Sequence, residues 1–221
     1  MCRRFIVVDR AEVARIAAEI ARNLEAHAGE LGALDPLEAW RPFLSAPVPD
    51  APDGRREAFP QTVVPLIAPT GRGAQLAVAD MAWGFEVPWK KGPVFNTRIE
   101  TVLGDPACLW ADSLARRRCI VPAWAFYESH ATETVPSART GKPVKRPYAF
   151  ERADGAPLLL AGIHDRGRFS LVTTQPNGTV APVHDRMPLA LDAREAALWL
   201  AGTYAPLLDR TSLALTAAPE R

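Results

Sequence analysis

The second residue of the chain is the first candidate for chemistry. Removal of Met1, the usual fate of an initiator methionine before a small side chain, leaves Cys2 with a thiol and a free α-amine. The amine has an ordinary pKa of about 7.7 to 8.0 and the thiol of about 8.5, so part of the amine is nucleophilic near neutral pH. With an aldehyde the amine forms an imine, and the thiol then closes a five-membered thiazolidine ring. We therefore expect Cys2 to react with aldehydes, and the plain alternative is that it is only a small second residue.

Seven short motifs occur in order along nearly the whole chain, and together they are specific although each alone is weak. They are Met1-Cys2-Arg3, Pro60 to Ile67, Met81-Ala82-Trp83-Gly84 with Pro88-Trp89, Asn96 to Thr101, Arg117 to Ala123, Phe126-Tyr127-Glu128 and His184 to Pro188. By these motifs the chain resembles the SOS response-associated peptidase family. The resemblance implies a DNA damage protein that caps abasic sites in single-stranded DNA with a thiazolidine crosslink through the N-terminal Cys2.

The resemblance also implies a catalytic set, and each member has a physical reason to belong to it. The set is Cys2, Asn96, Glu128 and His184. Glu128 follows apolar residues, so we expect partial burial and a raised pKa that suit a general acid and base, with an exposed strand-end carboxylate as the alternative. His184 titrates near neutrality and suits protonation of the sugar oxygen, although a lone histidine is more often structural. Asn96 can hydrogen-bond the amine or the sugar, or serve as a turn residue.

Contacts to DNA are expected from residues close to these motifs. Arg98 and Arg186 lie two positions after Asn96 and His184, and guanidinium forks suit the phosphates on either side of a lesion. Further candidates are Thr173 for a hydroxyl contact, Trp83 and Pro60 for apolar contact with bases, and Arg3 for another phosphate. Trp83 is equally a candidate for the core. Other basic residues are expected on solvated faces, with extension of a basic groove as the alternative: Lys90, Lys91, Arg116, Lys142, Lys145 and Arg146.

Three readings of the function stay open. The main reading is an enzyme that forms Cys2-dependent crosslinks to abasic sites, with lyase and autopeptidase activities as additional expectations. The first alternative is a cysteine-type peptidase or amidohydrolase, in which Cys2 acts on the Met1 peptide bond or on other peptides. General proteolysis needs a peptide groove and an oxyanion hole, which the sequence does not identify. The second alternative is a binding module without covalent chemistry, and it predicts lesion binding that survives loss of the thiol.

Composition narrows the class of protein without pointing to DNA. The 221 residues suit one domain, and 26 basic against 25 acidic residues give a net charge of +1, which provides no global field to attract nucleic acid. Cys2, Cys108 and Cys119 have no metal-ligand spacing, so we expect no metal and no cofactor. No apolar run approaches the roughly 18 residues of a membrane span. We therefore expect a cytoplasmic protein, and we expect it to be a monomer. The family resemblance further implies single-stranded DNA containing abasic sites as the partner and association with the nucleoid on damage.

A single α+β domain is expected to position these residues. Apolar residues at three- and four-residue steps predict a helix from Asp9 to about Ala28, with Asp9 and Glu12 as a capping box and Gly29 as the stop. Six proline positions between residues 35 and 60 predict a surface loop or insertion, which we place at residues 33–60.

Beyond this loop, short β-like runs predict a curved, mostly antiparallel sheet or open barrel flanked by helices. The runs are Thr62 to Ala68, Gln75 to Ala79, Cys119 to Ala123, Tyr148 to Glu151, Leu158 to Ile163 and Phe169 to Thr174. Helices are expected at about Pro106 to Arg117 and at Asp192 to Ala201, the latter with an Asp192–Glu195 capping box and a Gly202 stop. Residues 216–221 are expected to form a frayed tail.

Overall fold

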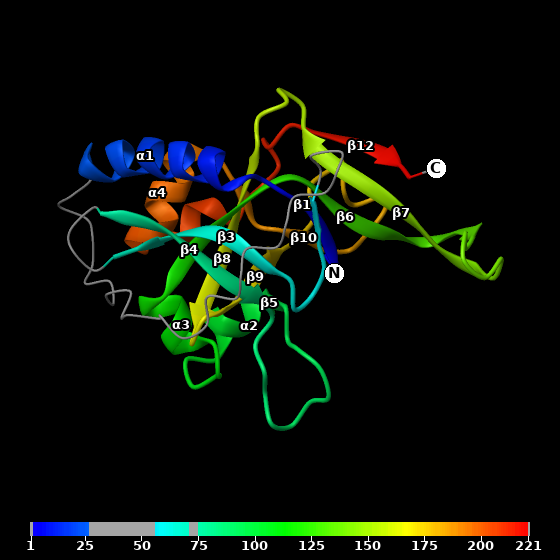
Figure 1. Ribbon diagram of the computed structural model, residues 1–221, viewed down its shortest axis with the longest axis horizontal. Coiled ribbons are helices and arrows are strands. Elements are labelled where there is room, and N and C mark those ends of the chain that lie inside the picture. The colour runs from blue at the N-terminus through cyan, green and yellow to red at the C-terminus, as the bar shows by residue number, and fades with distance from the viewer. Residues whose placement is uncertain (1, 27–55, 71–74, 221) are drawn as a thin grey trace.

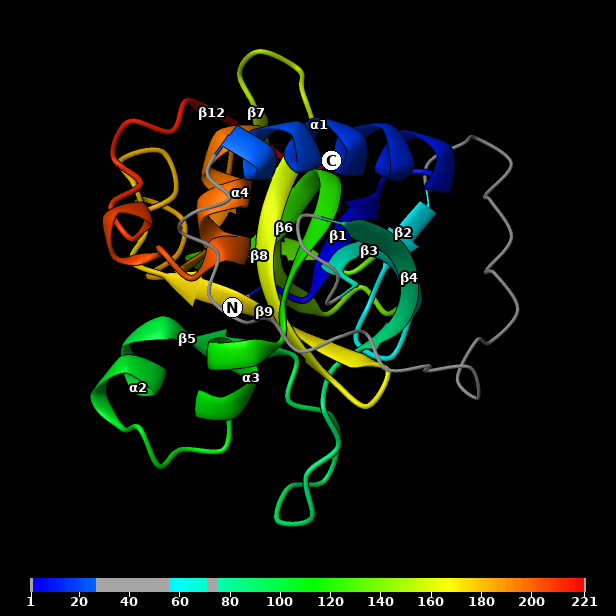
Figure 2. The same cartoon turned by 90° about the vertical axis from the view of Figure 1, so that its left-hand side faces the viewer.

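The computed structural model describes residues 2–26, 56–70 and 75–220. Within these ranges one curved, twelve-stranded sheet forms the body of the protein. Helices α1 (Arg10–Ala26) and α4 (Ala193–Ala201) lie side by side over part of the sheet (Figures 1 and 2). The predicted α+β class with a curved sheet flanked by helices is confirmed.

The remaining elements are short apart from two long strands. The strands are β1 Arg4–Val7, β2 Arg56–Ala58, β3 Val63–Pro69, β4 Leu76–Trp83, β5 Asn96–Arg98, β6 Arg118–Pro136, β7 Pro143–Arg152, β8 Leu158–Asp165, β9 Arg168–Thr174, β10 Met187–Pro188, β11 Ala190–Leu191 and β12 Leu215–Pro219. The remaining helices are α2 Ile99–Gly104, α3 Ala111–Arg116 and the 3-10 helix η3 Ala205–Leu207. Strand β6, with 19 residues, pairs with β1, β3, β7 and β8 and therefore organises the sheet.

The strands are mostly antiparallel, as predicted. Among the described strands, β4 and β5 depart from this rule because both pair parallel with β9. Pairings run from β3 through β6, β8, β9 and β4 and return to β3, so the sheet curves round on itself. This curvature brings segments that are distant in sequence to one side of the sheet, and the N-terminal strand β1 is one of these segments.

Side chains of β6 alternate between two apolar cores. Cys119, Val121 and Ala123 belong to one core, which is built mainly from strand residues. Ile120 belongs to the other core, together with Trp199 of α4 and the buried face of α1. Successive residues of a strand point to opposite faces, so this stretch is buried on both faces and its sequence is apolar without interruption.

Helix α1 begins at the predicted cap. The Asp9 carboxylate accepts a hydrogen bond from the backbone N–H of Glu12 at 3.0 Å. The Glu12 carboxylate pairs with Arg15, so an ion pair replaces the second half of the expected capping box. The periodic apolar residues Val13, Ile16, Ile20 and Leu24 are buried as predicted. The helix is described as far as Ala26, and its predicted stop at Gly29 lies outside the described residues.

Helix α4 has both of its predicted ends. The Asp192 carboxylate accepts from the backbone N–H of Glu195 at 2.8 Å, and the Glu195 carboxylate accepts from that of Asp192 at 3.0 Å. Gly202 follows the helix with a φ of +92°, in the left-handed region. A Cβ at this position would lie 3.2 Å from Nη2 of Arg118. Backbone conformation and lack of space therefore both favour glycine here.

Several predicted boundaries are wrong. Residues 56–58, assigned to the proline-rich loop, form β2 and pair with β1, while the expected loop over residues 33–55 lies outside the described residues. The expected frayed tail contributes most of β12, because its backbone groups complete the edge of β7. The helix predicted from Pro106 begins at Ala111.

No helix in the described ranges is long and apolar enough to cross a membrane.

Arg118 ties two helices to the sheet. Its side chain is 3% exposed and donates hydrogen bonds to three backbone carbonyls at 2.6 to 3.3 Å. Leu114 and Ala115 supply two of these carbonyls near the end of α3, and Leu200 supplies the third near the end of α4. Carbonyls in the last turn lack partners within their own helix, and the helix dipole favours a cation there.

Replacing Arg118 by Met should lower the free energy of unfolding by about 2 to 4 kcal/mol, because the buried carbonyls of Leu114 and Leu200 and the part-buried carbonyl of Ala115 lose their donor. Arg116→Met, on the exposed side of α3, is the matched control and should change stability by less than about 0.5 kcal/mol. Urea denaturation followed by circular dichroism measures both variants. Equal stabilities would contradict the bridging role of Arg118.

Candidate active site

The pairing of β1 with β6 brings Cys2 close to Glu128. Arg4 lies opposite Tyr127 in this antiparallel register, so the residues before β1 run toward Glu128. Asn96, the first residue of β5, donates a hydrogen bond from Nδ2 to the backbone carbonyl of Cys2 at 2.7 Å. Three distant parts of the sequence therefore meet at the start of β1.

The Cys2 side chain is fully buried, and its surroundings favour the thiol over the thiolate. Burial raises the pKa of the Cys2 thiol well above its ordinary value, and the nearby charge of Glu128 raises it further. The sulfur lies 3.4 Å from the carbonyl oxygen of Arg4, to which the S–H group donates. A neutral thiol is a weak nucleophile by itself, so chemistry at Cys2 needs a base nearby or a second nucleophile that reacts first.

Glu128 is the buried acid of the site. Glu128 is 3% exposed, and burial raises the pKa of its carboxyl group to about 7. The prediction of a buried carboxyl with a raised pKa is therefore confirmed. Its expected alternative as an exposed strand-end carboxylate is wrong, because β6 continues for eight residues beyond it. A carboxyl group with this pKa holds and releases protons near neutral pH.

His184 faces Glu128 across the site. Its Nε2 lies 3.7 Å from Oε2 of Glu128. Its Nδ1 lies 3.0 Å from the backbone nitrogen of Arg186, 3.2 Å from the Arg186 carbonyl oxygen and 3.0 Å from Oδ1 of Asp185, so both a donor and acceptors surround this nitrogen. Burial lowers the pKa of His184, although the carboxylate of Asp185 near Nδ1 acts in the opposite direction. The imidazole is therefore mostly neutral at pH 7, with its Nε2 close to the carboxyl group.

An open cleft of about 750 Å³ gives access to Glu128 and His184, whereas Cys2 and Asn96 are not among the residues that line it. It is lined by Arg3, Arg4, Phe59, Pro60, Gln61, Pro93, Phe95, Tyr127, Glu128, Ser129, Pro147 and His184. The lining combines an acid, an imidazole, two guanidinium groups and several apolar rings. Pro60 and Arg3, both expected to contact DNA, lie on this lining, and Arg3 is exposed.

The two arginines expected to bind phosphate have different surroundings. Arg98 is exposed at the end of β5 and makes no hydrogen bond through its side chain with the described residues. Arg186 is 6% exposed and forms a bidentate ion pair with Glu100, at 2.9 and 2.7 Å, and a hydrogen bond to the carbonyl of Thr173 at 2.8 Å. Burial alone would raise the pKa of Glu100, but the Arg186 hydrogen bond and charge lower it overall. Thr173 is fully buried, so its hydroxyl is not on the surface.

Trp83 is not accessible for stacking on a nucleobase. Its side chain is fully buried, packs edge-on against Phe5 and Phe95, and stacks on Phe169. Its Nε1 donates a hydrogen bond to the carbonyl of Phe95 at 2.8 Å. The expectation of a base contact is therefore corrected to the core role, because a nucleobase cannot reach a ring that neighbouring side chains enclose completely.

The structure reveals two candidates that sequence reasoning did not assign. Trp89 is 67% exposed in the loop that leads into Asn96, between a proline and two lysines that signal a solvated segment. The guanidinium of Arg4 lies 3.7 Å from the ring centroid of Tyr127, and both side chains line the cleft. The alternation of β1 gives no sign of this cation–π contact, because it depends on pairing with β6.

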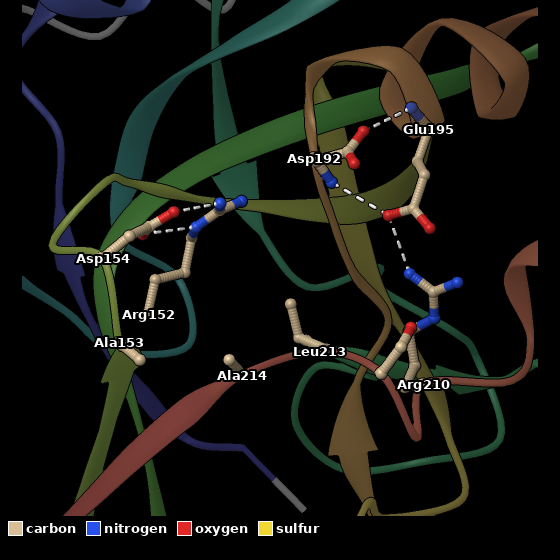
Figure 3. A pocket seen from close by; sticks show the side chains of 9 residues that line it. Arg152, Ala153, Asp154, Asp192, Glu195, Arg210, Leu213 and Ala214 are labelled. Atoms are coloured by element: carbon tan, nitrogen blue, oxygen red, sulfur yellow. Dashed lines mark hydrogen bonds and ion pairs between the residues drawn. The ribbon is translucent and has the colours of Figure 1, made fainter.

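A second hollow, of about 470 Å³, lies near the start of α4 (Figure 3). Its charged side chains pair with one another: Arg152 donates to Asp154 at 2.9 Å, and Arg210 lies 2.8 Å from Glu195. None of the expected site residues is among those that line it. The ion pairs in this hollow therefore connect the segments of the chain that surround the start of α4.

Comparison with known proteins places the chain in a family. The profile of the SOS response associated peptidase (SRAP) family matches residues 1–219. The abasic site processing protein YoaM of Bacillus subtilis is 27% identical over 149 residues, which cover 61% of this chain and 61% of that protein. The abasic site processing protein YedK of Escherichia coli is 28% identical over 165 residues, which cover 70% of this chain and 68% of YedK. The chain thus matches about three fifths to two thirds of the length of these relatives.

Solved structures share the fold of this chain. A phage-related protein of Bordetella bronchiseptica is 27% identical, with 76% of this chain and 82% of that chain covered and a TM-score of 0.58. A protein of Bacteroides thetaiotaomicron is 21% identical and shares the fold, with a TM-score of 0.53 and coverage of 90% of this chain and 88% of its own. Since the family profile extends over nearly every residue, the chain belongs to the SOS response associated peptidase family.

Proposed function

We propose that this protein processes abasic sites in single-stranded DNA by forming a thiazolidine crosslink through Cys2 in the DNA damage response. The names of the relatives support action on abasic sites. The observation that carries the proposal is the convergence of Cys2, Asn96, Glu128 and His184, with a buried carboxyl group whose pKa is about 7. An abasic sugar in its open form presents an aldehyde, which is the carbonyl that a 1,2-aminothiol captures as a ring.

The α-amine of Cys2 reacts first in this proposal, after Met1 has been removed. The amine nitrogen adds to the C1′ aldehyde carbon to give a carbinolamine, which loses water to give an imine. Glu128 supplies the proton that the departing hydroxyl needs, and as a carboxylate it accepts a proton from the amine. Its acid form also protonates the sugar ring oxygen when the ring opens, and the neutral His184 imidazole lies beside it, where it can hydrogen-bond the sugar.

The thiol reacts second, because burial keeps it protonated. Its sulfur adds to the imine carbon, and the thiol proton passes through Glu128 to the nitrogen. The product is a five-membered ring of the amine nitrogen, Cα, Cβ and sulfur of Cys2, and C1′. Water is released and no oxidant or reductant is consumed. Asn96 holds the Cys2 carbonyl through Nδ2, and its Oδ1, which has no hydrogen-bond partner among the described residues, is available to accept from the amine.

We propose a revised set of DNA contacts that follows exposure. Arg98 and Arg3 contact phosphates, because both are exposed beside the site. Trp89 replaces Trp83 as a stacking surface, and Pro60 adds an apolar contact at the cleft. Arg186 contributes positive potential while Glu100 and the Thr173 carbonyl hold its guanidinium group.

A peptidase confined to the Met1 peptide bond is the alternative, and the family description supports it. Attack on that bond needs a thiolate or a base-activated thiol, whereas burial raises the pKa of the Cys2 thiol. Capture of an aldehyde needs no thiolate, because the amine attacks first. The raised thiol pKa therefore favours crosslinking over general proteolysis. Lyase activity, the monomeric state and association with the nucleoid stay predictions.

Replacing Cys2 by Ala should abolish the heat-stable adduct, because the amine alone forms an imine that water hydrolyses. Borohydride should trap the imine of the variant, provided that intact mass confirms the loss of Met1. Denaturing gels of protein with a single-stranded oligonucleotide that contains one abasic site measure both outcomes. A heat-stable adduct formed by Cys2→Ala at the wild-type rate would assign the chemistry to another nucleophile.

Replacing Glu128 by Gln should slow adduct formation about 100-fold or more, because the site loses its proton carrier. The wild-type rate should rise with pH as the α-amine loses its proton and then fall at higher pH, with an inflection set by Glu128, which must be protonated for dehydration; this falling limb and its inflection should disappear in the variant. Single-turnover crosslinking from pH 5 to 9 measures both features. An unchanged inflection in Glu128→Gln would exclude Glu128 as the titrating acid.

Replacing Arg98 by Ala should weaken binding to single-stranded DNA of any sequence and reduce the salt slope by about 0.7, the value for one lost phosphate contact. Arg186→Ala should change the slope less, because its guanidinium is held within the protein. Arg22→Ala on the exposed side of α1 is the control. Fluorescence anisotropy over a series of salt concentrations measures the slopes, and an unchanged slope for Arg98→Ala would remove it from the phosphate contacts.

A further inference from the structure

A single carboxylate links β12 to the start of β1. Strand β12 lies along β7 (Figure 1), and Glu220 follows it directly. The N–H of Glu220 donates a hydrogen bond to the carbonyl of Pro147 at 2.9 Å, and its carboxylate accepts one from Nη2 of Arg4 at 2.6 Å. Arg4 is the first residue of β1. The segment that the sequence assigned to a frayed tail therefore contacts the strand that follows Cys2.

The side chain of Arg4 is held on several sides. Besides Glu220, the carboxylate of Glu57 accepts a hydrogen bond from its Nη1 at 3.3 Å, and the ring centroid of Tyr127 lies 3.7 Å from the guanidinium carbon. Burial alone would lower the pKa of Arg4, but the hydrogen bond and charge of Glu220 raise it overall. One cation and two carboxylates give this cluster a charge of −1. The cluster therefore holds Arg4 within the protein and does not attract phosphate.

Arg4 is in turn connected to Cys2. The S–H group of Cys2 donates to the backbone carbonyl of Arg4, with the sulfur 3.4 Å from the oxygen. Arg3, which separates the two residues, is exposed. The first residues of a chain fray unless they are tied down. The place of the sulfur therefore depends on how firmly the start of β1 is held, and the Arg4 side chain supplies contacts there in addition to those of the β1–β6 ladder.

The start of β1 also sets the distance between Cys2 and Glu128. Arg4 pairs with Tyr127, so Cys2 lies two residues before one member of this pair and Glu128 one residue after the other. Each proton transfer of the proposed reaction passes between Cys2 and Glu128. Reactions of this kind depend steeply on the separation of the reacting groups. A loosened start of β1 would therefore slow the chemistry without removing any group that takes part in it.

We propose that Glu220 is a positioning residue for Cys2, which it holds beside Glu128 through the guanidinium group of Arg4. The proposal rests on the proposed function for the reaction that Cys2 performs, whereas the contacts themselves do not depend on it. When the carboxylate of Glu220 is removed, Arg4 keeps the longer contact with Glu57. The start of β1 should then open more often, while the rest of the sheet stays intact.

The test compares Glu220→Ala with the matched control Glu25→Ala, which removes an exposed carboxylate from α1. The first measurement is the rate at which iodoacetamide alkylates each cysteine, read by peptide mass spectrometry. Cys119 is as fully buried as Cys2 and serves as the internal control. The second is single-turnover crosslinking to a single-stranded oligonucleotide with one abasic site, over a series of protein concentrations. It gives a saturating rate and a half-saturating concentration, and thermal unfolding shows that the variants are folded.

In Glu220→Ala the alkylation of Cys2 should accelerate on the order of tenfold and that of Cys119 should not change, because only the start of β1 opens more often. The saturating crosslinking rate should fall on the order of tenfold, with a half-saturating concentration within about twofold of the wild type. Glu25→Ala should match the wild type throughout. The double variant Arg4→Met/Glu220→Ala should be no slower than Arg4→Met alone, because Glu220 acts through Arg4.

An unchanged alkylation rate at Cys2, or an unchanged saturating rate, would overturn the proposal. So would an equal acceleration at Cys119, which would mean that the whole protein had loosened. A change confined to the half-saturating concentration would also overturn it, by assigning the cluster to DNA binding. If the wild type itself forms no crosslink, the proposed function fails alone, because alkylation of Cys2 still decides whether Glu220 holds the residue in place.

Discussion

The antiparallel pairing of β1 with β6 is the constraint on which the site depends. Strand β1 has four residues, and three of them are buried within the sheet. This register sets Arg4 opposite Tyr127, so Cys2 comes close to Glu128, and the Asn96 hydrogen bond to the Cys2 carbonyl fixes the same segment from β5. A shift of one residue would turn every side chain of β1 to the opposite face of the sheet. The apolar packing of β1 thus determines where Cys2 lies.

Burial of the Glu128 carboxyl group lowers the stability of the folded protein near neutral pH. Because its pKa is raised to about 7 in the folded state, the folded protein binds this proton more tightly than the unfolded chain does. Stability from this group is present at low pH and decreases as pH rises from about 4.5 through 7. Near neutrality the group is partly protonated, which is the condition for proton transfer in both directions. Burial of Glu128 is therefore unfavourable for stability near neutral pH, but it gives the carboxyl group a pKa that suits proton transfer.

Arginine has two separate uses in this protein. Arg118, Arg186 and Arg210 are at most 6% exposed, and carbonyl or carboxylate oxygens surround their guanidinium groups. They join helices and strands and lie beneath the surface. Arg98, Arg139 and Lys142 are exposed, and their side chains make no hydrogen bond or ion pair with the described residues. A nearly neutral chain can therefore present local positive charge on its surface, because the fold sorts its cations by burial.

The sequence alone determined the local features: the caps of α1 and α4, the Gly202 stop, most strand centres and the burial expected for Glu128. Each depends on neighbours within a few residues or on the order of the motifs. Tertiary structure decided that Trp83 is core while Trp89 is exposed, that Glu100 holds Arg186, and that the expected tail pairs with β7. Exposure and edge pairing depend on side chains and strands far away in the sequence, so identical residue types have different roles according to what packs on them.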